Sequence, residues 1–229
     1  MLMNCAIIPA RGGSKRIPKK NIIDFCGKPM IAWSIEAAKK SECFDRIIIS
    51  TDDDEIAEIS IKFGGEILFK RPDELSDDFT STSDVIAHAI KWFIKEVYEP
   101  QLVCCIYATA PLIDYKYIQN GYEIIANSNL DFVFSATDFS FPVQRSFFLD
   151  ENHQLKMLYP EHYKTRSQDL KKFYHDAGQF YWGKTLAWVD QKEIFSRNSK
   201  PILIPNSKVQ DIDTLEDLEV AKIKFSRKD

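Results

Sequence analysis

Short apolar segments alternate with helical patterns along the chain, and this alternation constrains the fold more than any other feature of the sequence. The predicted strands are apolar throughout and rich in Ile, Val and Cys, at 5–9, 46–51, 66–69, 102–107 and 131–135. Helical periodicity occurs at 29–38, 53–63, 83–97, 117–126 and 215–225. Strands apolar on both faces and separated by helices indicate an α/β fold with a three-layer, mostly parallel, doubly wound sheet.

The alternation stops between residues 139 and 172, where no clear helix is predicted and aromatic residues and turn formers are frequent. Strand-like sequence resumes at 179–182 and 202–204. We interpret residues 1–229 as one domain, with an insertion of strands and loops at approximately 138–173. The insertion carries more aromatic side chains than such a domain has room to cover, which predicts an interface. They include Phe141, Phe147, Phe148 and Tyr159.

Composition narrows the classes to which a chain of 229 residues with a net charge of −4 can belong. That charge argues against nucleic-acid binding, and no apolar run approaches the ~20 residues of a membrane-spanning helix. No basic segment precedes the short apolar stretch at the N-terminus, so we expect no signal peptide and a cytoplasmic protein. The five cysteines form no C-x-x-C pair and are expected to be reduced, and the four histidines lack the spacing of a zinc site.

A basic loop, residues 11–20, follows the first predicted strand, and five of its ten residues are Lys or Arg. In a parallel sheet this loop lies at the carboxyl edge, where ligands bind. Gly12 and Gly13 allow backbone N–H groups to approach an anion, and the cations would neutralise it, so the loop predicts a polyphosphate site. It matches neither the P-loop nor the dinucleotide-binding pattern. The alternative is a solvated run of charge in a turn.

Asp211 and Asp213 form the second candidate site. In an extended segment, side chains two residues apart share a face and lie about 6–7 Å apart, close enough to hold Mg²⁺ and phosphate oxygens together. The alternative is structural, because Asp213 and Glu216 have the spacing of a helix capping box. The rival acidic cluster, 52–54, is better explained as the N-terminus of a helix.

Three smaller features lie near the same edge of the predicted sheet or in the insertion. Arg71 follows the third predicted strand and either faces a nucleotide or sits in a surface turn set by Pro72. The segment 107–112 follows a central strand and is small and polar enough to line a pocket. Arg166, close to Gln168 in the insertion, is either a clamp for a carboxylate or an ordinary surface residue.

The run at 8–21, I-P-A-R-G-G-S-K-R-I-P-K-K-N, closely resembles the nucleotide-binding signature of the acylneuraminate cytidylyltransferases. Segments 50–52, 71–75 and 210–214 match the same family in order, so the resemblance covers nearly the whole chain. It implies a nucleotide-diphospho-sugar transferase fold and a requirement for Mg²⁺. It also implies a reaction that joins CTP to a nine-carbon ulosonic acid, giving a CMP-sugar and pyrophosphate.

The resemblance also implies roles for individual residues. Mg²⁺ would bind Asp211 and Asp213, which with Arg11 and Lys20 would be the catalytic residues. The residues expected to bind CTP are Ala10, Arg11, Gly12, Gly13, Ser14, Lys15, Lys20, Asn21, Arg71 and Thr82. Those expected around the sugar are Tyr107, Thr109, Arg166, Gln168, Asp176, Gln179 and Tyr181. The insertion would be a dimerisation arm that reaches over the partner's site in a homodimer.

Two segments differ from the sialic acid branch of this family and resemble the pseudaminic acid branch. Tyr107 stands where the sialic acid branch usually carries Gln, and 174–184 replaces a P-N-G-A-I-Y-like run. In that branch the sugar carries acylamino groups at C5 and C7 and ends in a methyl group. We therefore expect a more apolar sugar pocket, with Phe180 and Trp182 on one face of a strand as an aromatic wall and the turn at 176–179 as its polar end.

The expected reaction transfers CMP from CTP to the anomeric hydroxyl of pseudaminic acid. One alternative is the same reaction on N-acetylneuraminic, legionaminic or deoxy-octulosonic acid. Another is a nucleotide-binding relative that has lost catalysis, although Lys20, Asp211 and Asp213 are all present.

Overall fold

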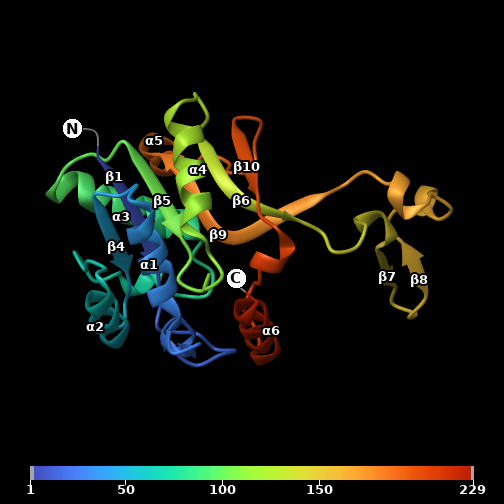
Figure 1. The fold of residues 1–229 in the computed structure, drawn as a ribbon, viewed down its shortest axis with the longest axis horizontal. Helices are drawn as coiled ribbons and strands as arrows, with labels where there is room; N and C mark the ends of the chain where they lie inside the picture. Colours follow the sequence, from blue (N-terminus) through green and yellow to red (C-terminus); the bar gives the residue numbers. More distant parts are fainter. Residues whose placement is uncertain (1–2, 228–229) are drawn as a thin grey trace.

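The structure is a computed structural model that describes residues 3–227. Its centre is a six-stranded sheet in the order β10-β6-β9-β5-β1-β4 (Figure 1). The strands are β1 (Asn4–Pro9), β4 (Arg46–Ser50), β5 (Leu102–Ile106), β6 (Phe132–Asp138), β9 (Tyr174–Lys184) and β10 (Ser199–Leu203). Only β9 is antiparallel to its neighbours in this sheet, so the predicted mostly parallel α/β sheet is confirmed.

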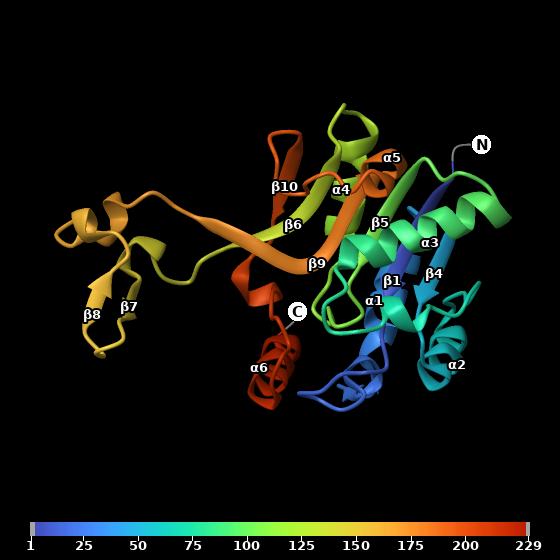
Figure 2. The ribbon, with the colours of Figure 1, turned by 180° about the vertical axis from the view of Figure 1, so that it is seen from behind.

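Helices cover both faces of the sheet and make the three layers. The helices are α1 (Met30–Ser41), α2 (Asp54–Phe63), α3 (Thr82–Glu96), α4 (Tyr115–Ala126), α5 (Thr185–Val189) and α6 (Leu215–Ser226). Residues of α1, α2 and α4 pack into one apolar core with one face of the sheet, and residues of α3 and α5 pack against the other face (Figures 1 and 2). Neighbouring residues of β5 enter opposite cores, which explains why that strand is apolar throughout.

Most predicted helices begin and end within a few residues of the observed ones. Asp53 caps α2 by accepting a hydrogen bond from the backbone N–H of Ile56 at 2.9 Å, as expected of the acidic cluster. The third strand predicted at 66–69 is wrong. Only Glu66 forms a parallel bridge, to Ile48, and the residues after it pack against the sheet cores without pairing as a strand.

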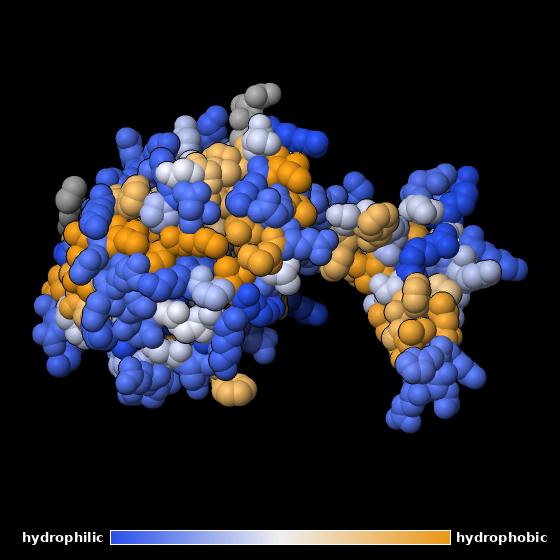
Figure 3. Space-filling view, turned by 90° about the horizontal axis from the view of Figure 1, so that it is seen from below, coloured by the Kyte–Doolittle hydropathy of each residue, from blue (hydrophilic) through white to orange (hydrophobic). Residues whose placement is uncertain are grey.

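The insertion leaves the sheet as an arm between β6 and β9 (Figures 1 and 2). It contains the antiparallel hairpin of β7 (Phe147–Leu149) and β8 (Leu155–Met157). Short 3-10 helices complete it, η3 (Val143–Arg145), η4 (Pro160–His162) and η5 (Ser167–Asp169). Apolar side chains gather on the arm (Figure 3). Those of Phe147, Phe148, Leu149 and Leu155 are each at least half exposed.

A separate apolar cluster brings an early segment of the chain and a late one together near the carboxyl edge of the sheet. Ile17 of the basic loop and Ile212 are almost completely buried in it, with Phe25 of a small hairpin and Leu218 of α6. That hairpin pairs β2 (Asp24–Phe25) with β3 (Lys28–Pro29). The cluster therefore places the residues beside Ile212 against the basic loop. Within residues 3–227, no helix is long and apolar enough to cross a membrane.

Candidate active site

Hydrogen bonds to the neighbouring loops hold the start of the basic loop. The backbone N–H of Gly12 donates to Asp52 Oδ1 at 2.9 Å, and Asn21 Nδ2 donates to the carbonyl of Arg11 at 2.8 Å. A Cβ atom on Gly12 would lie 2.7 Å from Asp53 Oδ2, so the close approach of the loop to this acidic turn requires glycine. Asn21 lies in the short helix η1 (Lys20–Ile22).

A basic cavity of about 560 Å³ opens between this loop, the start of α3 and the loop after β5. Its basic members are Arg11, Lys15, Arg16, Lys20 and Arg71. Its other lining residues include Ser14, Asn21, Asp77, Asp78, Thr80, Thr82, Tyr107 and Thr109. Four of the five cations of the basic loop line the cavity, whereas Lys19 pairs with Glu55 instead. Of those four, Lys20 and Arg11 are the more enclosed, whereas the side chains of Lys15 and Arg16 stay largely exposed to solvent.

Arg71 is a buried cation at the floor of this cavity, not a residue of a surface turn. Its side chain is 3% exposed, and Nε donates to the Ser50 hydroxyl at 3.0 Å. Burial lowers the pKa of Arg71 to about 10, which still leaves it protonated at neutral pH. Among residues 3–227, no carboxylate lies within ion-pair distance of it. A buried guanidinium in this state favours a ligand that supplies acceptor atoms.

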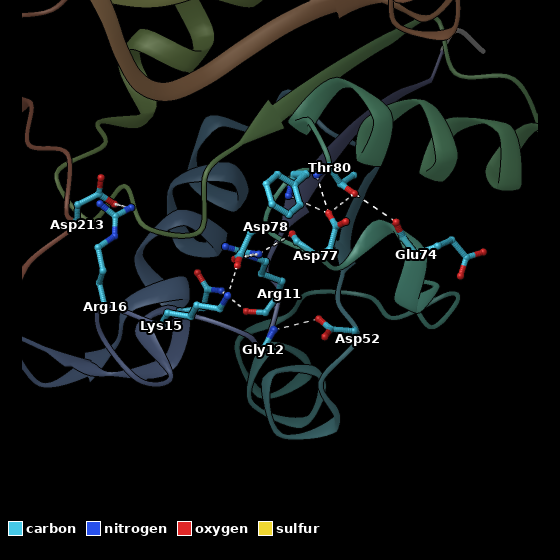
Figure 4. A network of polar contacts seen from close by, with 12 residues as sticks. Arg11, Gly12, Lys15, Arg16, Asp52, Glu74, Asp77, Asp78, Thr80 and Asp213 are labelled. Carbon is cyan, nitrogen blue, oxygen red and sulfur yellow. Dashed lines mark hydrogen bonds and ion pairs between the residues drawn. The ribbon is translucent and has the colours of Figure 1, made fainter.

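Carboxylates pair with the other cations of the cavity (Figure 4). Asp78 pairs with Arg11 at 2.7 Å and with Lys15. Hydrogen bonds from Lys15 and then Arg11 hold the pKa of Asp78 below its usual value. Asp213 pairs with Arg16 at 3.0 Å and with Lys20 at 3.2 Å. The two carboxylates therefore offset part of the positive charge of the basic cavity before any ligand enters.

Lys20 is the most enclosed of these paired cations. Its Nζ donates to the carbonyl of Ile212 at 2.7 Å, and its side chain is 20% exposed. The sequence neighbour Lys19 points elsewhere, has a left-handed backbone with φ 52°, and is 62% exposed. The two lysines therefore occupy different environments, although the sequence pattern does not separate them.

Asp211 and Asp213 lie in a loop between η6 (Asn206–Lys208) and α6, not in a strand. The capping alternative for Asp213 is wrong, because Thr214 caps α6 and forms the capping box with Asp217. Desolvation and the nearby charge of Asp213 raise the pKa of Asp211. Neither carboxylate is therefore used to cap α6, and Asp213 borders the basic cavity through its pairs with Arg16 and Lys20.

These two carboxylates fit a Mg²⁺ ion that also binds a phosphate ligand. Mg²⁺ is commonly held by one or two carboxylates, water and substrate phosphates. Burial raises the pKa of Asp211 first and the charge of Asp213 raises it further, and a bound cation would offset both effects. In the described part of the chain, no group of three or more His, Cys, Asp or Glu side chains is placed to hold a metal. The remaining ligands would have to come from substrate and water.

A second cavity of about 490 Å³ adjoins the basic cavity, and Tyr107 lines both. Its other lining residues include Ser140, His175, Asp176, Asn206, Gln210, Asp211 and Lys224. The hydroxyl of Tyr181 donates to Asp176, and the hydroxyls of Tyr107 and Thr82 lie 3.2 Å apart. A polar path thus runs from the second cavity toward the basic cavity.

The residues predicted to bind CTP and those predicted to bind the sugar are distributed over the two cavities, the core and the arm. Seven of the ten predicted CTP residues line the basic cavity, namely Arg11, Ser14, Lys15, Lys20, Asn21, Arg71 and Thr82. Ala10, Gly12 and Gly13 do not line it. Of the predicted sugar residues, Tyr107 and Asp176 line the second cavity and Thr109 lines the basic one. Gln179 and Tyr181 are buried, and Arg166 and Gln168 lie in the arm.

The expected aromatic wall of Phe180 and Trp182 is wrong. Both side chains are fully buried and pack in the core beneath α4, where Trp182 Nε1 donates to the carbonyl of Ile118 at 2.9 Å. Alternation along β9 does put them on one face, but that face is covered by a helix. Tyr181, on the opposite face, is the residue of this trio that connects to the second cavity.

Lys224 is a residue of the second cavity that no sequence pattern indicates. It lies in the last turn of α6, and its Nζ donates to the carbonyl of Val209 at 2.6 Å and to Gln210 Oε1 at 3.1 Å. It therefore fixes the loop that leads into Asp211. A lysine near a helix C-terminus is common and does not mark a site by itself.

Comparison with known proteins identifies the family of this chain. The family model described as "Cytidylyltransferase" matches residues 5–215. The chain belongs to the cytidylyltransferase family. It is 48% identical over 224 residues to a pseudaminic acid cytidylyltransferase of Campylobacter jejuni, which covers 98% of this chain and 97% of the relative. It is also 40% identical over 208 residues to a bifunctional pseudaminic acid cytidylyltransferase and hydrolase of Helicobacter pylori. That alignment covers 90% of this chain and 40% of the relative.

A solved structure confirms the fold of this cytidylyltransferase. The structure of CMP:2-keto-3-deoxy-manno-octonic acid synthetase complexed with CTP aligns with a TM-score of 0.71 at 17% identity. The alignment covers 98% of this chain and 99% of the other. At this identity the likeness establishes the shared fold, whereas the family match establishes a nucleotidyltransferase.

The environment of Lys20 predicts a role in turnover that Lys19 does not share. Lys20→Ala should lower kcat at least ~100-fold, as expected for loss of an electrostatic stabiliser in a partly enclosed site. Lys19→Ala, which removes an equal charge one residue away, should keep a near-normal kcat. Steady-state kinetics with CTP as the varied substrate would measure both. A change in KM alone for Lys20→Ala would restrict Lys20 to docking the nucleotide.

Proposed function

We propose that this enzyme transfers CMP from CTP to the anomeric hydroxyl of pseudaminic acid, giving CMP-pseudaminic acid and pyrophosphate. The observation that carries the proposal is the high identity to the Campylobacter jejuni enzyme over almost the full length of both chains. Two adjoining cavities, one strongly basic and one that contains Asp176, support a reaction between a polyphosphate and a second, polar substrate.

The basic cavity is the proposed site of CTP. Arg11, Lys15 and Lys20 would contact the triphosphate; they are three of the four cations that the basic loop presents to the cavity. Arg71 and Thr82, deeper in the cavity, would lie around the cytidine with Asn21. The buried guanidinium of Arg71 supports this assignment, since a base and its sugar offer acceptors without a full charge.

The reaction forms a bond between the anomeric oxygen and the α-phosphorus of CTP and breaks the bond from that phosphorus to the bridging oxygen. The pyrophosphate leaves with the electron pair, and the hydroxyl loses a proton. Lys20 and Arg11 would stabilise the charge that develops on the leaving group. Asp211 and Asp213 would hold Mg²⁺, which, when bound, neutralises phosphate oxygens and makes a nearby hydroxyl more acidic.

The second cavity is the proposed site of the sugar, and its chemistry differs from the apolar pocket expected. Asp176 is fixed by the hydroxyl of Tyr181 and faces a cavity that also contains His175. A carboxylate accepts hydrogen bonds from amide N–H groups, such as those of two acylamino substituents. Selectivity would thus depend on which donors meet Asp176, more than on an aromatic surface.

Pyrophosphate release from CTP with a panel of purified sugars tests the proposed substrate. Pseudaminic acid should exceed N-acetylneuraminic acid by at least ~100-fold in kcat/KM, because unmatched buried polar groups discriminate strongly. Legionaminic and deoxy-octulosonic acids complete the panel. Comparable kcat/KM values would overturn the substrate and leave cytidylyl transfer standing. No release with any sugar would favour a non-catalytic relative.

Removal of the metal tests the role of the carboxylate pair. EDTA should abolish turnover, with recovery on addition of excess Mg²⁺, and Asp211→Asn should lower kcat at least ~100-fold. The matched control is Glu216→Gln, which removes one negative charge from an exposed position nearby on α6. The assigned role is wrong if Asp211→Asn and Asp213→Asn both keep near-normal rates in folded protein.

We propose further that the arm, taken as residues 138–173, joins two copies of the chain into a homodimer. Its exposed apolar side chains support this, since contiguous apolar patches usually mark interfaces. Arg166 is 71% exposed on the arm and pairs with Asp169 at 2.7 Å. In the dimer it would reach the sugar carboxylate in the partner's site, together with Gln168.

Light scattering tests the dimer. The wild-type protein should have the mass of two chains at micromolar concentration, and Phe148→Asp should shift it toward one chain by placing a charge in the apolar patch of the hairpin. The control is Ile61→Asp, because Ile61 is 56% exposed on α2 in the body of the protein. A fully active wild-type monomer would rule out the proposed arrangement.

A further inference from the structure

The acidic turn, residues 76–81, closes over the basic cavity beside α3 (Figure 4). Asp77 shapes this turn, because its Oδ1 accepts hydrogen bonds from the backbone N–H of Phe79 at 3.0 Å and of Thr80 at 2.7 Å. The turn is therefore a compact unit with its own internal hydrogen bonds. It presents Asp78 to the cations of the basic loop.

Asp78 occupies the place that a phosphate ligand would need. One carboxylate oxygen pairs with Arg11 at 2.7 Å and the other with Lys15. Arg11 Nη1 also donates to the backbone carbonyl of Asp77 at 2.5 Å. The same two cations are proposed to bind the triphosphate of CTP, so carboxylate and phosphate oxygens compete for the same donors.

The contact is weak enough to be exchanged. The side chains of Arg11 and Asp78 are each 35% exposed, and that of Lys15 is 80% exposed. Ion pairs with this exposure contribute little, because water and salt screen them. Phe79, beside Asp78, is 93% exposed, so it does not anchor the turn by packing. A polyphosphate with several charged oxygens can therefore displace Asp78 without disturbing the core.

We propose that Asp78 is a built-in competitor for phosphate at Arg11 and Lys15. It holds these two side chains in place in the empty enzyme, yields to the triphosphate of CTP, and pairs with them again as pyrophosphate leaves. The consequence is specific to the pyrophosphate end of the nucleotide: Asp78 weakens the binding of CTP and pyrophosphate and leaves CMP unaffected. This inference rests on the proposed function of the basic cavity.

Calorimetric binding without sugar tests the inference on the intact protein. Asp78→Asn keeps the shape of the side chain and removes its charge. It should bind CTP and pyrophosphate about tenfold more tightly than wild type, the scale of one or two exposed ion pairs, and bind CMP equally well. Asp78→Glu, which restores the charge, should return affinities to near the wild-type values. Asp73→Asn should change none of them, because Asp73 is an exposed neighbour that contacts neither cation.

Product inhibition supplies the kinetic counterpart. In Asp78→Asn the inhibition constant for pyrophosphate should fall about tenfold, in parallel with its dissociation constant. Because salt screens exposed ion pairs, a higher salt concentration should bring the inhibition constants of the variant and wild type closer together. Unchanged or weaker binding of pyrophosphate by Asp78→Asn would overturn the inference. An equal gain in affinity for CMP would also overturn it, as would an equal gain in pyrophosphate affinity in Asp73→Asn. Either result would indicate a general effect of charge.

Failure of the proposed function would be visible separately. If wild type binds inorganic pyrophosphate but not CTP, the assignment of the cavity to CTP fails. The comparison of Asp78→Asn with wild type for pyrophosphate alone still decides whether Asp78 competes with phosphate.

Discussion

The apolar contact of Ile17 with the cluster that contains Ile212 sets where Asp211 and Asp213 lie relative to the basic loop. The two residues are far apart in sequence, yet both are almost completely buried in one small core below the carboxyl edge of the sheet. Each carries charged neighbours that this core holds at fixed positions. The hydrogen bond from Lys20 Nζ to the carbonyl of Ile212, at 2.7 Å, connects the two loops directly. Apolar burial is thus what keeps the proposed metal carboxylates beside the proposed phosphate cations.

The pairing of the loop cations with carboxylates is the second organising feature of the site. Four clustered cations would repel one another, and Asp78 and Asp213 offset that repulsion from opposite sides of the basic cavity. Both carboxylates belong to loops, whereas the scaffold beneath them is sheet and helix. Exchange of partners on ligand binding therefore requires movement of side chains and turns, and the packed core can remain as it is.

The sequence predicted the features that depend on local pattern. Apolar strands separated by helices indicated the parallel sheet, and this placed the basic loop at its carboxyl edge, because parallel strands end at a common edge. Other features depend on tertiary contacts. Alternation along β9 put Phe180 and Trp182 on one face, but both faces of the strand are covered, so periodicity could not identify the face near the site. Thr214 caps α6, whereas the sequence pattern had indicated Asp213, because the helix begins one residue later than that pattern requires.

The second cavity shows why the sugar side was harder to predict than the nucleotide side. Its residues come from the loops after β5 and β6, from β9, from the segment before α6 and from α6 itself, and no short motif joins them. The pairing of β6 with β9 shifts register between Phe134 and Ala136, and Gly178 adopts φ 61° opposite this shift. This irregularity lies directly between Asp176, in the cavity, and the buried part of β9. The same pair of strands continues outward into the arm, so the backbone that positions Asp176 also carries the proposed dimer interface. The second cavity therefore shares its supporting backbone with the arm, whereas the basic loop is held by β1, β4 and the separate cluster around Ile17.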